Sequence, residues 1–172
     1  MLELFLLRHA KSSWDDPEVS DFDRPLNKRG KEDAPKMGEH LASVGVRPDL
    51  IVASPAKRAK KTAKEVARAL GYDEERIVWK ESIYEASPQT LLYLICALPQ
   101  EAKRVMLVGH NPGLTMLANL LGDVTIDNIP TAGVVGIAFD AKTWDAACKM
   151  RGHTIMFDYP KKLWRHDSHI DH

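Results

Sequence analysis

The chain has 172 residues, of which 44% are apolar and 28% are charged, and its 24 basic side chains balance its 24 acidic ones. A chain of this length forms one domain and buries enough surface to fold without a metal or a disulfide. The zero net charge argues against a general nucleic-acid or anionic-membrane binder, which would carry a basic excess. The apolar run that ends at Leu7 is too short for a signal peptide, and no later run approaches the roughly 20 residues of a membrane span.

Apolar runs and helical spacing alternate along the chain. We expect a first strand at Leu2–Leu7, then an acidic, proline-broken loop at residues 14–23. The next expected elements are a helix from about Lys28 that ends near Gly45, a strand at Leu50–Ala53, a helix that begins after Ser54-Pro55 and ends before Gly71, and a short strand at Ile77–Trp79. The last are a helix from Ser87-Pro88 to about Leu98, a strand at Arg104–Val108, a helix at Leu114–Leu121, and strands at Val134–Phe139 and Thr154–Phe157.

This alternation predicts an α/β fold: a single three-layer domain whose mostly parallel sheet carries helices on both faces. We assign residues 1–160 to this domain and 161–172 to a C-terminal tail that holds three of the histidines.

Sequence motifs for metal and cofactor chemistry are absent. The two cysteines, Cys96 and Cys148, lack the C-x-x-C spacing of a metal or redox site, and Cys96 lies in an apolar run typical of a small buried side chain. Neither the H-E-x-x-H metal motif nor the glycine-rich nucleotide loops occur, and the G-x-S-x-G elbow is missing too. We therefore expect reduced cysteines, a cytoplasmic location, and neither a metal nor another cofactor.

Arginine and histidine side chains follow three of the expected strands. Arg8 and His9 end the first strand, Arg58 lies in the first turn of the helix after the second, and His110 follows the strand at Arg104–Val108. Each of them alone is compatible with a surface turn, a capped strand end or a solvated helix. However, the carboxyl ends of parallel strands meet at one edge of a sheet, so these side chains are expected together. Guanidinium groups bind phosphate or carboxylate through charge-assisted hydrogen bonds, and this edge is therefore a candidate anion site.

These residues lie within ordered motifs. The motifs are Leu7–Ala10, Arg24–Gly30, Ser54–Ala63 (S-P-A-K-R-A-K-K-T-A), Val108–Pro112 (V-G-H-N-P) and Pro130–Gly133. Together they resemble the motifs of the histidine phosphatase superfamily, and within it those of the small SixA-type phosphohistidine phosphatases. The resemblance covers most of the chain and implies a phosphoglycerate mutase-like catalytic domain.

The resemblance also implies a mechanism. His9 would attack phosphorus as a neutral imidazole and become transiently phosphorylated, while its other ring nitrogen donates to a backbone carbonyl. Arg8, Arg58 and His110 would surround the phosphate oxygens, where the charge of the transition state is spread, without a need for magnesium. Beside a phosphate dianion, His110 is expected to be protonated.

A general acid must protonate the leaving group and then activate water. Glu85 is our preferred candidate and Glu81 the competitor, although both carboxylates are also compatible with a solvated loop.

Three further residues concern phosphate binding. Many relatives carry Asn where this chain has Asp15, and since a carboxylate would repel phosphate, we expect Asp15 to point away. Asn111 is a candidate to supply the missing amide, and Ser12 is a further candidate phosphate ligand.

Three functions are open at this stage. A protein phosphohistidine phosphatase is preferred because a protonated imidazole leaves easily and demands little of a positioned acid. The alternatives are a small-molecule phosphomonoesterase, acting on a sugar, nucleotide or lipid-derived phosphate, and a noncatalytic phosphate-binding module. The spacing between Arg58 and His110 leaves no room for a capping insertion, which predicts an open pocket. The expected partner is thus a phosphorylated protein or a small phosphorylated metabolite, not nucleic acid or a membrane. We expect the chain to be a monomer or weak dimer.

The zero net charge hides two charged segments. Residues 56–68 carry six basic side chains against Glu65 alone, and residues 14–23 carry five acidic side chains and no basic one. Such a surface is able to steer a phosphorylated partner at low salt. Trp14, beside the nucleophile motif, is a candidate for lining the entrance of the pocket.

Overall fold

In the computed structural model, which describes residues 1–165, six strands form one sheet in the order β3-β2-β4-β1-β5-β6. The strands are β1 (Leu2–Arg8), β2 (Leu50–Ala53), β3 (Val78–Trp79), β4 (Arg104–Gly109), β5 (Val134–Phe139) and β6 (His153–Asp158). The helices are α1 (Lys28–Ser43), α2 (Lys57–Leu70), α3 (Pro88–Cys96), α4 (Gly113–Leu121), α5 (Trp144–Ala147) and α6 (Pro160–Leu163), with 3-10 turns at Glu74–Arg76 and Glu81–Ile83.

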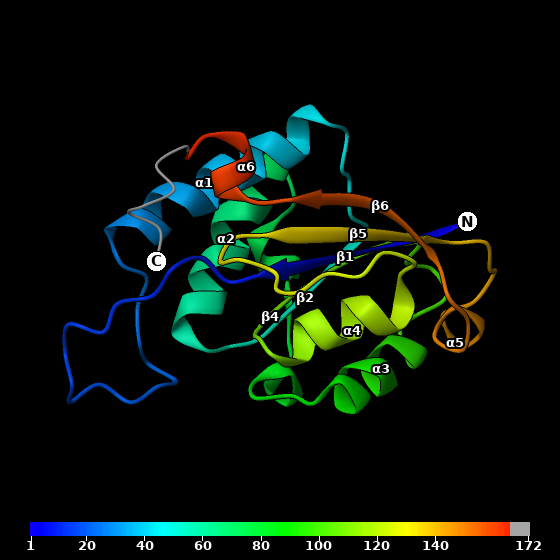
Figure 1. The fold of residues 1–172 in the computed structure, drawn as a ribbon, viewed down its shortest axis with the longest axis horizontal. Coiled ribbons are helices and arrows are strands. Elements are labelled where there is room, and N and C mark those ends of the chain that lie inside the picture. The colour runs from blue at the N-terminus through cyan, green and yellow to red at the C-terminus, as the bar shows by residue number, and fades with distance from the viewer. Residues whose placement is uncertain (166–172) are drawn as a thin grey trace.

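The sheet is mostly parallel, as predicted. Strands β3, β2, β4 and β1 pair in parallel, whereas β5 pairs antiparallel with both β1 and β6. Helices α1 and α2 cover one face and α3 and α4 the other, which gives the three predicted layers (Figure 1). Because β2, β4 and β1 are parallel neighbours, their carboxyl ends lie side by side at one edge of the sheet.

Strand β1 is apolar on both faces because both faces are covered. Leu4 and Leu6 pack in the cluster that includes residues of α3 and α4, whereas Phe5 and Leu7 pack in the cluster that includes residues of α1 and α2. Successive side chains of a strand point to opposite faces, so a strand between two helical layers needs a continuous apolar run. The same packing fixes the direction of Arg8 at the strand's end.

Helix ends follow their predicted capping residues. The side chain of Ser87 accepts a hydrogen bond from the Thr90 N–H and caps α3 at the predicted position. Gly71 ends α2 in the left-handed conformation, with φ of 71°, that glycine adopts without strain. The turn after α2 therefore directs the chain back toward β3.

The predicted tail begins too early, because the folded chain continues to Arg165. Helix α6 is followed by Trp164 and Arg165, whose Nε1 and Nε donate to one oxygen of Asp33 on α1 at 2.9 and 2.8 Å. Asp33 is almost fully buried, so these bonds, together with an ion pair to Arg29 at 3.8 Å, compensate for the desolvation of its carboxylate. The tail histidines at 166, 169 and 172 lie outside the described residues.

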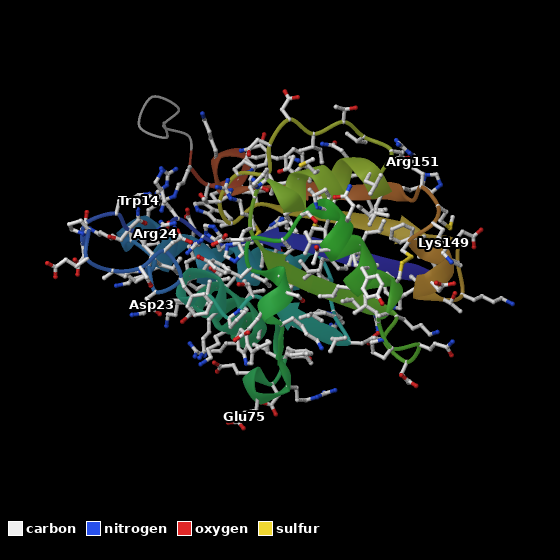
Figure 2. All side chains as sticks on the ribbon, turned by 90° about the horizontal axis from the view of Figure 1, so that it is seen from below. Trp14, Asp23, Arg24, Glu75, Lys149 and Arg151 are labelled. Atoms are coloured by element: carbon white, nitrogen blue, oxygen red, sulfur yellow. A yellow bond between two sulfur atoms is a disulfide. The ribbon has the colours of Figure 1, made fainter. Side chains whose placement is uncertain are left out.

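The expectation of a reduced, buried Cys96 is wrong, because Cys96 and Cys148 form a disulfide with Cα atoms 5.5 Å apart. Cys96 ends α3 and Cys148 follows α5, a short helix that the sequence pattern does not reveal. The buried Trp144 of α5 donates its Nε1–H to the Ala102 carbonyl and brings the two helix ends together. Figure 2 shows the disulfide beside Lys149, at the opposite end of the molecule from Trp14 and Arg24.

Within residues 1–165, no helix is both long enough and apolar enough to cross a membrane. Over the same residues, side chains of metal-ligand type gather in one group, Cys96, Asp145 and Cys148, in which the disulfide already occupies both sulfurs.

Candidate active site

His9 follows β1 and is only 6% exposed. Its Nδ1 lies 2.7 Å from the carbonyl oxygen of Ala10, an atom that only accepts, so Nδ1 carries the proton and Nε2 keeps its lone pair. Burial lowers the pKa of His9 to about 3, against the opposing effect of the hydrogen bond to Ala10, and the nearby positive charges lower it further. The ring is therefore neutral at neutral pH, and the predicted hydrogen bond to a backbone carbonyl is confirmed.

Three parts of the chain hold the backbone around His9. Its N–H donates to the Gly109 carbonyl at the end of β4, and its own carbonyl accepts from the Ala132 N–H. The next residue, Ala10, donates its N–H to Thr62 Oγ1 at 3.0 Å, and the Thr62 hydroxyl donates to a carbonyl in the first turn of α2. Four of the sequence motifs thus converge on the nucleophile through backbone contacts.

Arg8 and Arg58 are both anchored by terminal nitrogens. Arg8 Nη1 donates to the Ile129 carbonyl at 2.9 Å, and Arg58 Nη1 donates to the Asp21 carbonyl at 2.6 Å. Burial lowers the pKa of Arg8, and the charge of Arg58 lowers it further, which shows how closely positive charge is gathered here. Both residues lie where the sequence predicts them.

Arg24 joins this cationic group, although the sequence indicates it only as one residue of a longer motif. Its Nη1 donates to Ser12 Oγ, its Nη2 donates to Asp21 Oδ1 at 3.1 Å, and its guanidinium carbon lies 3.7 Å from the centre of the Trp14 ring. Trp14 is itself 77% exposed, and Figure 2 shows the two side chains together at one end of the molecule. Ser12 therefore contacts a site arginine, and its role as a phosphate ligand stays a prediction.

Asp21 is the second site residue that the sequence does not reveal. Its Oδ2 lies 3.1 Å from Arg58 Nη2 and accepts the Tyr84 hydroxyl at 2.5 Å, while Oδ1 accepts from Arg24. The bond from Tyr84, followed by the arginine contacts, holds the pKa of the Asp21 carboxyl well below its usual range. The acidic composition of residues 14–23 marks a loop but does not distinguish Asp21 from the neighbouring acids.

His110 lies beside His9, with ring centroids 5.2 Å apart. Its Nε2 is 2.8 Å from the hydroxyl of the buried Ser54, the first residue of the S-P-x-x-R motif. Burial, and then the charge of Arg58, lower the pKa of His110 to about 4, so the ring is neutral in the unliganded site. The protonated form that we expect belongs to the phosphate-bound state, where a dianion would raise this pKa.

Four buried N–H or ring-nitrogen groups have no hydrogen-bond partner among the described residues: the Nε atoms of Arg8, Arg24 and Arg58, and Nδ1 of His110. A buried donor without a partner costs roughly 1–3 kcal/mol, and more when it is charged. The three arginines and His110 also interact electrostatically with one another or with His9. This donor set fits a phosphate-sized anion bound against the His9 ring.

The structure separates the two candidate acids. Glu85 has a backbone φ of 55°, which is uncommon for a residue other than glycine, and its carboxylate interacts with the Tyr84 hydroxyl. The Tyr84 ring lies 5.5 Å from the His110 ring, so Glu85 is close to the site. Glu81 lies exposed on a 3-10 turn, where its carbonyl accepts from the Tyr84 N–H, but among the described residues its carboxylate contacts no site residue.

Asn111 stays a prediction as a phosphate ligand, and its side chain makes other contacts in this structure. Its Nδ2 donates to Asn128 Oδ1 and to the Ile129 carbonyl, and its Oδ1 accepts from both the N–H and the hydroxyl of Thr115. Both amide hydrogens are thus in use, and Asn111 holds the carbonyl that anchors Arg8. Asp15 is exposed and contacts none of the site residues among those described, as we expect.

The open pocket stays a prediction, although the His9 ring itself is only 6% exposed. No capping insertion is present between α2 and α3, but the loop at residues 14–23 contacts site residues on two elements. Asp21 bonds to Tyr84, and the Phe22 and Tyr84 rings meet edge to face with centroids 5.1 Å apart. These contacts join the loop to the residues around His9.

A neutral histidine beside buried arginine and histidine donors, on a three-layer α/β fold, is an arrangement suited to phosphoryl transfer. The chain belongs to the histidine phosphatase superfamily, whose branch 1 family model matches residues 4–88. It is 33% identical to the SixA protein of Agrobacterium tumefaciens, which is assigned as a phosphohistidine phosphatase; the match covers 92% of this chain and 98% of that one, with a TM-score of 0.77.

Two further relatives also match most of this chain. A protein histidine phosphatase SixA complexed with tungstate is 21% identical, and the match covers 94% of this chain and 99% of that one with a TM-score of 0.81, so the fold is shared. An uncharacterized chloroplastic protein of Arabidopsis thaliana is 33% identical over 157 residues, which make up 87% of this chain and 72% of the relative. The predicted family and the phosphoglycerate mutase-like fold are confirmed, and the chain is a phosphatase- or mutase-type enzyme.

Proposed function

We propose that this protein is a phosphohistidine phosphatase, which hydrolyses the phosphoryl group of a phosphohistidine side chain on another protein. The observation that carries the proposal is the state of His9: Nδ1 is bonded to a backbone carbonyl, and the neutral ring lies near arginines whose buried Nε atoms have no partner among the described residues. The similarity to SixA from Agrobacterium tumefaciens supports the substrate class.

The reaction proceeds in two steps. His9 Nε2 attacks phosphorus, the bond to the substrate imidazole breaks, and the Glu85 carboxyl gives its proton to the departing nitrogen. Water then attacks the phosphorus of phosphorylated His9, Glu85 takes the water proton, and inorganic phosphate leaves as His9 Nε2 regains its lone pair. Arg8, Arg58 and the other donors hold the equatorial oxygens in both steps and need no metal ion for that task.

The burial of His9 favours a second candidate, a phosphomonoesterase for a small metabolite phosphate. A nucleophile that is only 6% exposed is reached more readily by a small ester than by a bulky protein surface, and both reactions would use the same nucleophile. The two candidates differ in the leaving group, because an alkoxide needs a proton from Glu85 far more than an imidazole does.

Steady-state hydrolysis of free phosphohistidine, p-nitrophenyl phosphate and a panel of metabolite phosphates tests the proposal, with and without a chelator. We expect kcat/KM for phosphohistidine to exceed that for every ester by at least about tenfold, and chelation to have no effect. His9→Ala should abolish both activities, whereas His153→Ala, which changes an exposed histidine on β6, should abolish neither.

A phosphoryl group on His9, detected by mass spectrometry after an alkaline quench, would support the covalent step. Activity that survives His9→Ala would contradict that step, and a metabolite phosphate as the best substrate would select the second candidate. Strict dependence on magnesium would contradict the metal-free account.

A further inference from the structure

A groove lined with lysines lies next to the catalytic residues, on the side of α1 and α2. It has a volume of about 340 Å³ and is lined by Pro25, Leu26, Lys31, Lys57, Lys60, Lys61 and Lys64. Lys57 and Arg58 are the first two residues of α2, and Pro25 follows Arg24, so both walls of the groove continue directly into the site. The mechanism uses none of these lysines.

Few acidic side chains form ion pairs with the lysines of this groove. Lys61 pairs with Glu65 at 2.9 Å, and Lys60 lies over the Trp79 ring at 5.7 Å. Within residues 1–165, no hydrogen bond, ion pair or ring contact involves the side chains of Lys31, Lys57 and Lys64. Lys60 and Lys64 also face Asp73, Glu74 and Glu75 across a neighbouring groove, but they form no ion pair with them. Like charges held together in this way attract an anion from solution.

We propose that the lysine groove binds an acidic segment of the phosphorylated partner protein; this rests on the proposed function. Lys57 and Lys64 are seven residues apart on α2, which corresponds to about 10 Å along a helix. A single phosphate group cannot contact both ends of such a row. An extended peptide places side chains of one face about 7 Å apart, so two or three successive carboxylates cover the length of the row.

The backbone connects the groove to the reacting group. The Lys57 N–H donates to the Phe22 carbonyl at 2.9 Å, so α2 is fixed to the loop that carries Asp21. An acidic segment in the groove would therefore lie beside the residue presented to His9. It touches no reacting atom, and we expect it to lower KM and to accelerate association without changing kcat.

Two dye-labelled peptides of equal length test this proposal: one has a central phosphohistidine flanked by glutamates, and the other has the same residue flanked by glutamines. We expect the wild-type kcat/KM to be about tenfold higher for the glutamate peptide at low salt, and this preference to disappear at high salt. The triple variant Lys31→Gln/Lys57→Gln/Lys64→Gln should lose the preference and retain its activity on p-nitrophenyl phosphate. The control variant Lys103→Gln/Lys142→Gln/Lys149→Gln removes the same charge elsewhere and should keep the preference; Figure 2 shows Lys149 at the far end.

Binding of the unphosphorylated peptides, measured by fluorescence anisotropy, separates this proposal from the proposed function. The enzyme could hydrolyse only metabolite phosphates and still bind the unphosphorylated glutamate peptide more tightly than the glutamine peptide. That result would contradict the proposed function and support binding of an acidic segment in the lysine groove. Equal binding of the glutamate and glutamine peptides, or loss of selectivity in the control variant, would contradict binding of an acidic segment in the lysine groove. Tighter binding of short inorganic polyphosphate than of the glutamate peptide would overturn the assignment to an acidic protein.

Discussion

The Asp21 carboxylate lies 3.1 Å from the Arg58 guanidinium, measured from Oδ2 to Nη2, and the backbone carbonyl of Asp21 accepts from Nη1 of the same group. Both terminal nitrogens of Arg58 are therefore occupied, while its buried Nε has no partner within residues 1–165. Arg24 is held in the same way, since its Nη2 bonds to the other carboxylate oxygen. Asp21 is a positioning residue, because it decides which edge of each guanidinium is left for the phosphate.

We expect Asp21→Ala to lower kcat/KM for phosphohistidine about tenfold, because misplacing two guanidiniums weakens their hold on the transition state. Inhibition by inorganic phosphate should weaken in parallel. The matched control is Asp15→Ala, which removes the same charge from the same loop without touching Arg24 or Arg58 and should leave both measurements unchanged. A gain in activity from Asp21→Ala would instead show that the carboxylate competes with the phosphate.

The leaving group determines how much Glu85 matters. Glu85→Gln should lower hydrolysis of p-nitrophenyl phosphate or an alkyl phosphate by about a hundredfold and that of phosphohistidine by less than about tenfold. Glu81→Gln, which changes the exposed carboxylate four residues earlier, should alter neither rate. If Glu81→Gln removes the esterase activity while Glu85→Gln spares it, our assignment of the acid is reversed.

Sequence patterns predict the strand ends well because local rules govern them. Arg8, His9 and His110 follow buried apolar strands, and a parallel sheet brings such ends together whatever the loops do. The contacts of Asp21 depend instead on the path of a loop, which no periodicity records. Chemical preference alone does not settle the role of Asn111, since its amide suits phosphate as well as it suits the carbonyl and side-chain oxygens that it binds here.

Two neutral buried histidines should make the fold sensitive to acid. Burial lowers the pKa of His9 to about 3 and that of His110 to about 4, whereas both titrate near 6.5 in the unfolded chain. The unfolded chain therefore binds more protons below about pH 6.5, so the free energy of unfolding is greatest above that pH and falls as the pH drops toward 4. Between about pH 7 and about pH 5, each histidine should contribute a loss of about 2 kcal/mol.

Urea titrations at the two pH values measure this loss for the wild type, His110→Asn and the control His153→Asn. The His110→Asn protein should lose about 2 kcal/mol less than the wild type over the same interval. The His153→Asn protein, changed at an exposed position, should behave as the wild type does. An equal loss in His110→Asn and the wild type would mean that the pKa of His110 is not lowered in the unliganded fold.

The Cys96–Cys148 disulfide should contribute to stability and not to catalysis. It closes a sequence separation of 52 residues, and a cross-link of that span reduces the freedom of the unfolded chain by an amount worth about 2–4 kcal/mol. Reduction with dithiothreitol should lower the free energy of unfolding by this amount and leave kcat/KM unchanged, because the bond lies at the end of the molecule opposite the Trp14 and Arg24 side chains (Figure 2).

The double variant Cys96→Ala/Cys148→Ala is the control, since its stability should not respond to dithiothreitol. Titration of thiols in the denatured, unreduced protein decides whether the bond forms: two free thiols per chain would contradict it.

The redox state of the two cysteines in cells bears on the location of the protein, because disulfides are rare in the reducing cytosol. Two free thiols in protein taken from the cytosol, with a disulfide that forms only on exposure to an oxidant, would therefore agree with the expected cytoplasmic location. A fully oxidised pair in freshly lysed cells would favour an oxidising compartment instead.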